Sequence, residues 1–484
     1  MEGTGQDGGL LTRGRVGAVL APLSFLALWL LPLPLEDVRA HRLAAIFVAI
    51  VIMWVTEVVP IAVTALLIAP AMVVAGVTGA EAAFAPYADP LLFLFVGAFM
   101  IARSMTLHGL DRRLAMGIVA LPGVGDRPAL MRAAFMLAAV LLSMWISNTA
   151  TMAILAPILI GLVDRENANP KSVSGAVLAV AYACSLGGLG TPVGSPPNLI
   201  AMGFLRRQGG FDMSFFDWVA IALPAALIMM VALYGLVAWL LPTSALPVPT
   251  DRATATPPER RWSRGEITTA IAFGVAIAGW MVPGILKTAG VAGAAAVNEA
   301  LPGGAVALLA ASILFMVPDI GNGRRVLPWA EAAQIDWGII MLFGGGISLG
   351  TQLVETHLAE ALARGFVGAT GVTDLWTLTA LATVFTIFFT ETCSNTATSN
   401  IVSPIVIAIA TELGISAVPP VLAVGLAASC AFMLPIATGP NAIAYGTGRV
   451  PMTHMMRAGL WLNLACAVLI FAVLRILCPL YGWS

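Results

Sequence analysis

LLSMWISNTATMAILAPI (141–158) and FFTETCSNTATSNIVSPI (388–405) carry the same five residues, Ser-Asn-Thr-Ala-Thr. Each copy also has a proline ten residues after its first serine, Pro157 in one and Pro404 in the other. Both stretches are apolar runs, in which hydrocarbon would leave no water to satisfy polar side chains. One such triplet could simply join two helices by hydrogen bonds. Two matching copies half a chain apart indicate an internal duplication with a binding site at its centre.

The composition around these copies is that of a membrane protein. The chain has 484 residues, of which 59% are hydrophobic and only 10% are charged, whereas soluble domains have about 25% charged residues. Apolar segments recur from residue 16 to residue 478, and about eleven reach the roughly 20 residues that a bilayer crossing needs. We therefore predict an all-α polytopic membrane protein in a lipid bilayer, with no nucleic-acid partner. The five cysteines lack metal-like or disulfide-like spacing, which predicts small buried side chains.

Several segments of the first half depart from simple spans. The second span, 41–60, ends with Glu57 and Pro60, and Glu57 is either an anchor at the helix end or a functional acid. Residues 89–115 are interrupted by charges, which predicts a re-entrant hairpin. Helix-poor Asn and Thr predict a break inside 130–163. The segment GGLGTPVGSPPN (187–198) cannot continue a helix and should line a cavity inside the protein.

The second half repeats these landmarks in the same order and at nearly constant spacing. Residues 339–363 resemble the predicted hairpin segment, Ser394 matches Ser147, and Asn441 matches Asn198. The repeat predicts four parts: a tail and first span (1–40), a first inverted repeat (41–241), a cytoplasmic linker (242–265) and a second inverted repeat (266–484). One span before a five-span repeat places the N-terminus and the linker inside, in agreement with the linker arginines Arg252, Arg260, Arg261 and Arg264.

The side chains at the repeats suit both anions and cations. Hydroxyl, amide and backbone oxygens are hard ligands for Na⁺-sized ions, and Asn, Ser, Thr and backbone N–H groups donate to carboxylates. Ser143 precedes Ser147 by four residues, as Thr390 precedes Ser394, so each motif has a second hydroxyl one helical turn back. These hydroxyls either ligate a cation or bond to carbonyls of their own helices. The symmetric pair favours cation ligation.

Neither motif contains an arginine or a lysine. A dianion near the middle of the membrane would therefore depend on amides, helix dipoles and co-bound cations. This absence is a physical reason to expect cation-coupled transport.

These motifs, together with MWVTEVVPIAVTALL (53–67), GTPVGSPPNLI (190–200) and LPIATGPNAI (434–443), make the chain resemble the divalent anion:sodium symporter family, the carriers of di- and tricarboxylates and sulfate. The likeness covers about residues 40–475. It implies two re-entrant helical hairpins and broken helices, a scaffold and a transport domain that moves as an elevator, and a homodimer in the plasma (inner) membrane.

The resemblance also implies the ligands. One Na⁺ would be held by Ser143, Ser147, Asn148 and Gly194, and a second by Thr390, the Cys393 carbonyl, Asn395 and Ala437. The substrate carboxylates would face Ser147, Asn148, Thr149, Ser195, Ser394, Asn395, Thr396 and Thr438. Gly439 stands where the family usually has proline, which predicts a more flexible second loop.

The leading interpretation is a Na⁺-coupled importer of C4-dicarboxylates such as succinate, malate or fumarate, without an organic cofactor. A carboxylate exchanger without Na⁺ coupling and a sulfate transporter are the alternatives within the family. A channel would need a pore-lining charged ring. An enzyme would need a nucleophile–base pair or a metal set, and the four histidines are never paired at ligand spacing; we therefore predict no enzymatic activity.

Overall fold

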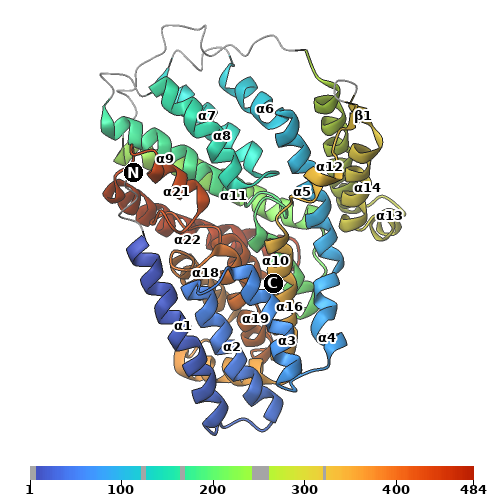
Figure 1. Ribbon diagram of the computed structural model, residues 1–484, viewed down its shortest axis with the longest axis vertical. Coiled ribbons are helices and arrows are strands. Elements are labelled where there is room, and N and C mark those ends of the chain that lie inside the picture. Colours follow the sequence, from blue (N-terminus) through green and yellow to red (C-terminus); the bar gives the residue numbers. More distant parts are fainter. Residues whose placement is uncertain (1–6, 122–126, 164–168, 242–260, 320–322) are drawn as a thin grey trace.

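The computed structural model describes residues 7–121, 127–163, 169–241, 261–319 and 323–484, most of them in helices (Figure 1). The first half contains α1 (Asp7–Leu30), α2 (Val38–Thr56), α3 (Ile61–Val74), α4 (Ala80–Phe84), the 3₁₀ helix η1 (Ala85–Ala88), α5 (Pro90–His108), α6 (Leu110–Val119), α7 (Pro128–Ser143), α8 (Asn148–Val163), α9 (Pro170–Gly187), α10 (Pro196–Arg207) and α11 (Phe215–Leu240).

The second half contains α12 (Arg264–Thr288), α13 (Ala294–Ala300), α14 (Gly303–Met316), α15 (Trp329–Ala332), α16 (Trp337–Glu355), α17 (Leu358–Thr370), α18 (Leu375–Thr390), α19 (Asn395–Glu412), α20 (Val418–Ala427), α21 (Gly439–Gly446) and α22 (Met452–Leu480). One small exception to the all-α prediction is an antiparallel pair of two-residue strands, β1 (Pro318–Asp319) and β2 (Arg324–Arg325). Of the predicted linker, residues 242–260 lie outside the described residues.

The two halves share their helix boundaries as well as their motifs. Helices α5, α7 and α8 have counterparts in α16, α18 and α19, whose first residues all follow at one constant offset, and α10 has its counterpart in α21 at nearly the same offset. Asp89 and Asp336, which occupy matched positions, cap α5 and α16 through side chains that accept from backbone N–H groups. The same capping chemistry sets the same helix starts, so the duplication extends to local structure.

The helical hairpins lie elsewhere than the charge pattern of 89–115 indicated. That prediction was wrong: α5 and its counterpart α16 are single helices of 19 residues, both apolar enough to cross a bilayer. The hairpins are formed instead by α7 with α8 and by α18 with α19, each pair packed side by side around its Ser-Asn-Thr loop. Charges after residue 102 belong to the end of α5 and to α6, where they form ion pairs beyond the apolar run.

Seven helices of the described residues are long and apolar enough to span a bilayer, or eight if the bent pair α17–α18 forms one span. Five more apolar helices are shorter, with 10 to 17 residues: α3, α7, α8, α14 and α20. The chain is therefore an integral membrane protein, and the total of about eleven crossings stays a prediction. Three of these shorter helices, α7, α8 and α20, end or begin at a break beside the Ser-Asn-Thr motifs or their neighbouring loops, as expected where irregular backbone is enclosed by protein.

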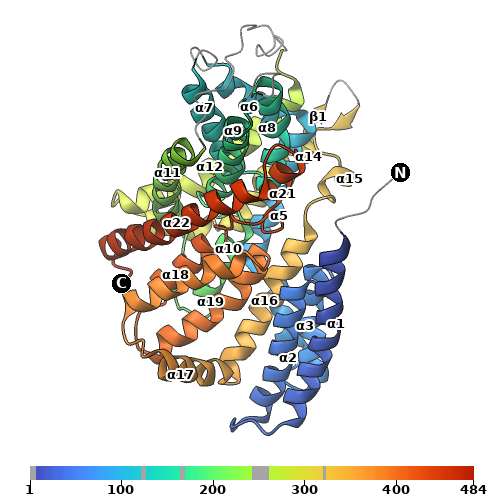
Figure 2. The same cartoon turned by 90° about the vertical axis from the view of Figure 1, so that its left-hand side faces the viewer.

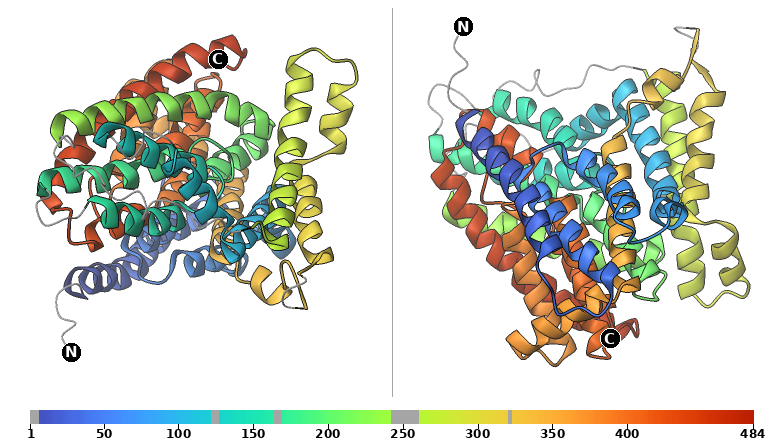
Figure 3. Two further views of the ribbon diagram at one scale, coloured as in Figure 1. Left: turned by 90° about the horizontal axis from the view of Figure 1, so that it is seen from above. Right: turned by 60° about the horizontal axis from the view of Figure 1, so that its bottom comes forward.

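The helices gather in groups around these breaks. Helices α1, α2 and α3 pack together, with α16 against α3 (Figure 2). Helices α12, α13 and α14 stand at one edge of the molecule (Figure 3), and α14 packs tightly on α5. The hairpins and the broken pairs α9–α10 and α20–α21 pack mainly against one another, as in the pairs α7·α9, α18·α20 and α10·α19, so the breaks are surrounded by helices.

Candidate functional site

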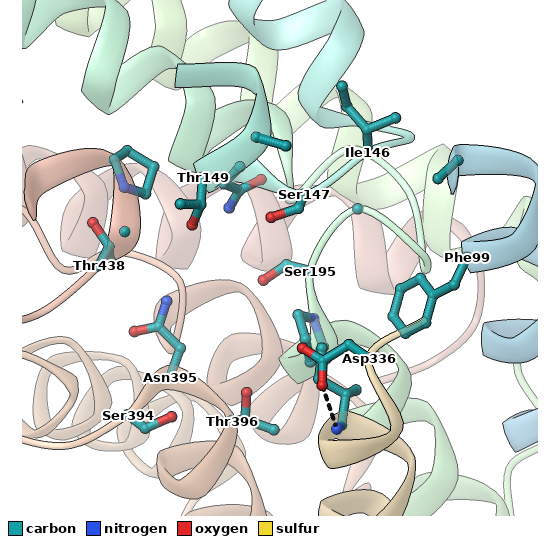
Figure 4. Close-up of a pocket in the computed structure, with 18 of the residues that line it drawn as sticks. Phe99, Ile146, Ser147, Thr149, Ser195, Asp336, Ser394, Asn395, Thr396 and Thr438 are labelled. Atoms are coloured by element: carbon teal, nitrogen blue, oxygen red, sulfur yellow. Dashed lines mark hydrogen bonds between the residues drawn. The ribbon is translucent and has the colours of Figure 1, made fainter. Parts of the chain in front are cut away.

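Four helix breaks meet at one cavity of about 690 Å³ (Figure 4). They are the loops between α7 and α8, α9 and α10, α18 and α19, and α20 and α21. Asn148, Pro196, Asn395 and Gly439, the first residues of α8, α10, α19 and α21, all line this cavity. Four helix N-termini, the positive ends of the helix dipoles, therefore surround one space. The breaks predicted in both Ser-Asn-Thr stretches and in the glycine-rich loop are confirmed.

All eight residues predicted to face the substrate line the cavity: Ser147, Asn148, Thr149, Ser195, Ser394, Asn395, Thr396 and Thr438. Ser195 lies between the two Ser-Asn-Thr segments (Figure 4), and its hydroxyl is 2.8 Å from that of Ser429, a residue that sequence reasoning did not single out. The N-cap serines Ser195 and Ser394 make no side-chain bond to the N–H groups of α10 and α19. The start of α19 therefore keeps backbone N–H donors for an anion, whereas α10 begins with Pro196 and Pro197, which have no N–H, and offers only the positive end of its helix dipole.

The predicted cation ligands divide into two layers. Gly194 and Ala437 line the cavity together with both asparagines. Ser143 and Thr390 are fully buried behind it. The Ser143 hydroxyl donates to the side-chain oxygen of Asn148 at 2.5 Å.

The second half repeats this contact. The Thr390 hydroxyl donates to the side-chain oxygen of Asn395 at 2.8 Å, and it also lies 2.8 Å from the carbonyl of Ala428. The partners of both hydroxyls are thus the motif asparagines and, for Thr390, a carbonyl beyond its own helix, rather than carbonyls of their own helices. Each half gathers a hydroxyl and an amide oxygen at the same relative place, which suits a hard cation.

Gly188, which the sequence analysis passed over, leaves room at the first of these places. A Cβ on Gly188 would lie 2.6 Å from the Asn148 amide oxygen and 3.0 Å from the carbonyl oxygen of Gly194. Both oxygens belong to the predicted first Na⁺ set, so the missing side chain is a space bounded by cation ligands. The signal available in the sequence was the pair of glycines, Gly187 and Gly188, at the start of the loop.

Gly188→Ala should fill that space. We expect the apparent Na⁺ affinity of transport to fall by more than about tenfold, the equivalent of about 1.4 kcal/mol, because the Cβ displaces either the ion or the Asn148 amide. Gly190→Ala is the matched control, since its Cβ would meet only side-chain atoms of Met144, at 3.1–3.3 Å. Na⁺-activation curves of succinate uptake measure both variants, and equal curves for the two would contradict a cation at this place.

Two asparagines brace the loops that carry the cavity residues. The Asn198 amide donates to the carbonyls of Gly188 and Thr191, both at 2.8 Å. Asn441 does the same for Ala431 and Leu434, both at 3.0 Å. Each asparagine is fully buried, and the carbonyls that accept from Asn441 occupy the positions that match those of the first loop. These bonds hold irregular backbone in place where water is absent.

Glu391 is a second residue that sequence reasoning missed. It is buried, and its carboxylate accepts from the backbone N–H groups of Phe432, Met433 and Leu434 at 2.7, 2.8 and 3.3 Å. The amide of Asn463 donates to it as well, at 2.7 Å. The corresponding position of the first half holds a methionine, so only the second half has a buried carboxylate that binds the loop of its broken helix. We call these bonds of Glu391 the clasp. An acid inside an apolar run was the available signal.

Glu391→Gln should loosen the loop that carries Ala437 and Thr438. An amide group presents N–H where the carboxylate accepted N–H, and each lost charge-assisted bond costs about 1.5–3 kcal/mol. We expect weaker Na⁺ activation of uptake with wild-type folding, measured by detergent-solubilised melting. Glu412→Gln, at the exposed end of α19, is the control. Unchanged Na⁺ activation in Glu391→Gln would show that the clasp does not act on the site.

Charged side chains also reach the cavity wall. Glu57, Arg103 and Asp336 line it, and Arg103 pairs with Glu331 at 2.5 Å and with the Gln334 side chain at 2.6 Å. Glu57 ends α2 with a positive φ of 51°, so the helix-end position is confirmed, and the same residue faces the cavity. The acids outweigh the one paired arginine, which makes an unaccompanied anion still less favourable here.

Gly439 has a packing role that the sequence did not indicate, and the predicted flexibility of its loop stays a prediction. It begins the regular helix α21, and a Cβ on it would overlap the hydroxyl of Thr149. Glycine therefore permits the second broken helix to touch the first Ser-Asn-Thr segment. The contact joins the two halves across the cavity.

Sequence comparison with known proteins gives matches that cover nearly the whole chain. The family model of the sodium:sulfate symporter transmembrane region matches residues 15–483. The sodium-dependent dicarboxylate transporter SdcS of Staphylococcus saprophyticus is 31% identical over 482 residues, which cover 96% of this chain and 91% of that protein. An uncharacterized transporter of Haemophilus influenzae is 34% identical over 444 residues, 90% of this chain and 92% of that protein.

Solved structures show the same fold at much lower identity. The YdaH transporter of Alcanivorax borkumensis gives a TM-score of 0.52 at 14% identity and covers 98% of this chain and 97% of that one. MtrF of Neisseria gonorrhoeae gives 0.52 at 12% identity, with 96% and 94% covered. At such identities the likeness concerns the fold alone.

Proposed function

Because the chain belongs to the sodium:sulfate symporter family, whose members are transporters and not enzymes, we propose that it imports C4-dicarboxylates such as succinate, malate or fumarate together with Na⁺. The observation that carries this proposal is the pair of hydroxyl–asparagine contacts, one in each half, behind a cavity lined by both Ser-Asn-Thr segments. The sodium-dependent dicarboxylate transporters among its relatives support the same substrate class.

The donors of the cavity suit a molecule with two carboxylates. Each half contributes a Ser-Asn-Thr segment and two helix N-termini, so the two ends of a dicarboxylate can each meet one set. The cavity, of about 690 Å³, has room for a C4-dicarboxylate. We assign the substrate contacts to the eight cavity residues and the two Na⁺ sites to the ligand sets implied by the family.

Coupling follows from charge. With acids on the wall and the nearby arginine already paired, Na⁺ bound at the asparagines would supply the positive charge that a dianion needs. Binding of each ion then raises the affinity for the other by the same factor. Substrate and Na⁺ therefore cross together.

Uptake of radiolabelled succinate into proteoliposomes tests the proposal. Symport predicts uptake that needs an inward Na⁺ gradient and stops when choline replaces Na⁺. Uptake that ignores Na⁺ but needs a carboxylate inside the vesicles would establish exchange instead. Inhibition of succinate uptake by sulfate, together with sulfate uptake, would establish the third alternative.

For the movement we propose an elevator in which the hairpins and broken helices slide along α16. The surface of α16 lacks side chains where it meets them: a Cβ on Gly346 would overlap the Asn400 side-chain oxygen of α19, and one on Gly350 would overlap the Phe204 ring of α10. The Asn400 amide donates to the Leu342 carbonyl at 3.3 Å. A crosslink between cysteines at Leu342 and Asn400 should stop uptake but preserve Na⁺ binding, and continued uptake would refute sliding here.

We propose the domain order, the membrane topology and the oligomeric state from the internal repeat and from the family. The repeats 41–241 and 266–484 would be inverted, with the tail 1–40 before them and the linker 242–265 between them in the cytoplasm. The protein would be a homodimer of the plasma membrane with a cytoplasmic N-terminus, which Arg261 and Arg264 before and at the start of α12 support. Crosslinking of purified protein and protease cleavage of the linker in sealed vesicles test these two points.

A further inference from the structure

A second cavity, of about 460 Å³, lies apart from the substrate cavity. It is bounded by the N-terminal ends of α5, α11 and α14 and the C-terminal ends of α10 and α12. Its wall combines apolar side chains with Arg206, Asp212, Lys287 and Glu299. Arg206 pairs loosely with Asp212 at 3.7 Å, whereas Lys287 is exposed and has no ion pair among the described residues.

Two helices lead from one cavity to the other. On α5, Leu91 and Leu94 line the second cavity and Arg103 and Thr106 line the first. Arg103 lies nine residues beyond Leu94, or about 13 Å along the helix axis. On α10, Pro196 lines the first cavity and Arg206 the second, about 15 Å apart. Because α5 belongs to the candidate membrane span Ala80–His108, the two cavities lie at different depths along it, the second near the middle of that span and the first toward its C-terminal end.

Aromatic side chains fill the space between the cavities. Trp280 stacks on Phe215 with ring centroids 4.7 Å apart, and Trp145 packs edge-on against Phe273 at 5.0 Å. Trp145 also lies 6.5 Å from Trp280. A small void of about 10 Å³ among them shares Trp145, Ala102 and Val193 with the substrate cavity and Trp280 with the second cavity. Packed aromatic rings therefore lie between residues that line the substrate cavity and residues that line the second cavity.

The four rings come from the hairpin loop that carries the first Ser-Asn-Thr motif and from two neighbouring helices. Trp145 lies two residues before Ser147, on the loop of the first hairpin, and Phe215 begins α11. Phe273 and Trp280 belong to α12, at the edge of the molecule. A movement of the hairpin loop relative to α12 would separate Trp145 from its partners on α12, which hold it only by ring contacts.

We propose that the second cavity is the vestibule through which the substrate site opens to the opposite face of the membrane, and that Trp145, Phe215, Phe273 and Trp280 are the barrier closing it in this state. The proposal rests on the proposed transport function. Lys287, which has no ion pair among the described residues, offers the vestibule a cation that a dianionic substrate can meet, while Asp212 and Glu299 on the same wall balance Arg206 and Lys287 in number.

Labelling of single introduced cysteines with a membrane-impermeant maleimide tests the sidedness. Leu301→Cys reports the vestibule and Ile436→Cys the substrate cavity; both side chains line their cavities and are exposed, at 39% and 61%. The five native cysteines are buried, so the wild type is the blank. We expect the two positions to react faster, by about tenfold, from opposite faces of oriented vesicles. Preferential reaction of both from one face would overturn the vestibule.

The barrier is tested by Trp280→Ala in the Ile436→Cys chain. We expect the labelling of residue 436 from the vestibule side to rise about tenfold, with Trp280→Phe, which keeps a ring, close to wild type. Trp239→Ala is the matched control, because Trp239 is 66% exposed and contacts only Trp461 among aromatic rings of the described residues. Unchanged labelling in Trp280→Ala would overturn the barrier; if that variant does not fold, Phe215→Ala replaces it with the same two outcomes. Labelling does not depend on transport, so these experiments test the vestibule and the barrier even if the protein shows no Na⁺-coupled uptake.

Discussion

Asn148→Ala and Asn395→Ala should each nearly abolish Na⁺-driven succinate uptake. Each substitution removes an amide oxygen from a proposed cation site and leaves a fully buried hydroxyl, that of Ser143 or Thr390, without its asparagine partner. A buried group that loses its partner costs about 1–3 kcal/mol before the lost ligand is counted. We expect apparent Na⁺ affinity to fall about a hundredfold or more, the equivalent of about 2.7 kcal/mol.

The loss should persist at saturating succinate, because symport cannot proceed while a Na⁺ site stays empty. Asn148→Asp separates the roles of the amide: a carboxylate keeps an oxygen for the cation but repels the substrate, so Na⁺ binding should survive while the succinate constant rises. Ser143→Ala should act in the same direction as Asn148→Ala with a smaller effect. Na⁺-activation curves in proteoliposomes and direct Na⁺ binding measure these effects. Wild-type curves for both alanine variants would place the cations elsewhere.

Thr149→Val and Thr396→Val should each raise the apparent succinate constant about ten- to a hundredfold. Valine keeps the bulk of threonine and removes only the hydroxyl, and a neutral donor bonded to a charged oxygen contributes about 1.5–3 kcal/mol. Thr149 is exposed in the cavity and Thr396 is 8% exposed at its opposite wall (Figure 4). The two hydroxyls thus lie on different sides of the space that a dicarboxylate would occupy.

Thr392→Val is the control for these variants. Thr392 lies in the loop before the second Ser-Asn-Thr, and its hydroxyl bonds to the Phe389 carbonyl of the preceding helix at 3.0 Å. Transport kinetics across a succinate series at saturating Na⁺ distinguish the three variants. If Thr149→Val and Thr396→Val behave like Thr392→Val, those threonines only pack, and the carboxylates are bound by the helix N-termini and serines alone.

Much of the site could be predicted from the sequence, because a polar side chain in a hydrocarbon environment is costly and usually marks a binding site. The duplicated Ser-Asn-Thr predicted the break between Ser143 and Asn148 and its counterpart in the second half, and both helices end there. The spacing of four residues predicted a second hydroxyl beside each motif, and those of Ser143 and Thr390 lie against the motif asparagines. These signals are local, within one helical turn, and local geometry follows from sequence spacing.

The prediction from the sequence was wrong where it relied on the charges of one segment without knowledge of the residues that pack against it. The charges after residue 102 predicted a hairpin at 89–115, yet Arg103 and Arg113 are satisfied by Glu331 and Glu266, which belong to the other half of the chain. With these partners α5 continues as one helix. No local sequence pattern predicts ion-pair partners so far along the chain, because the pairing depends on how the second half folds against the first.

By itself the sequence determined the class of the protein, the duplication, the positions of the helix breaks and the residue types at the site, since each depends on hydropathy, helix propensity and spacing along one chain. Only the tertiary structure decided that the four breaks enclose one cavity, that Gly188 and Gly439 matter for the space they leave, and that Glu391 clasps the second broken helix. It also decided that aromatic rings from α11, α12 and the first hairpin loop pack together between this cavity and a second one. These features arise where segments from both halves meet, and the free space and hydrogen bonds at such a meeting belong to no single stretch of the chain.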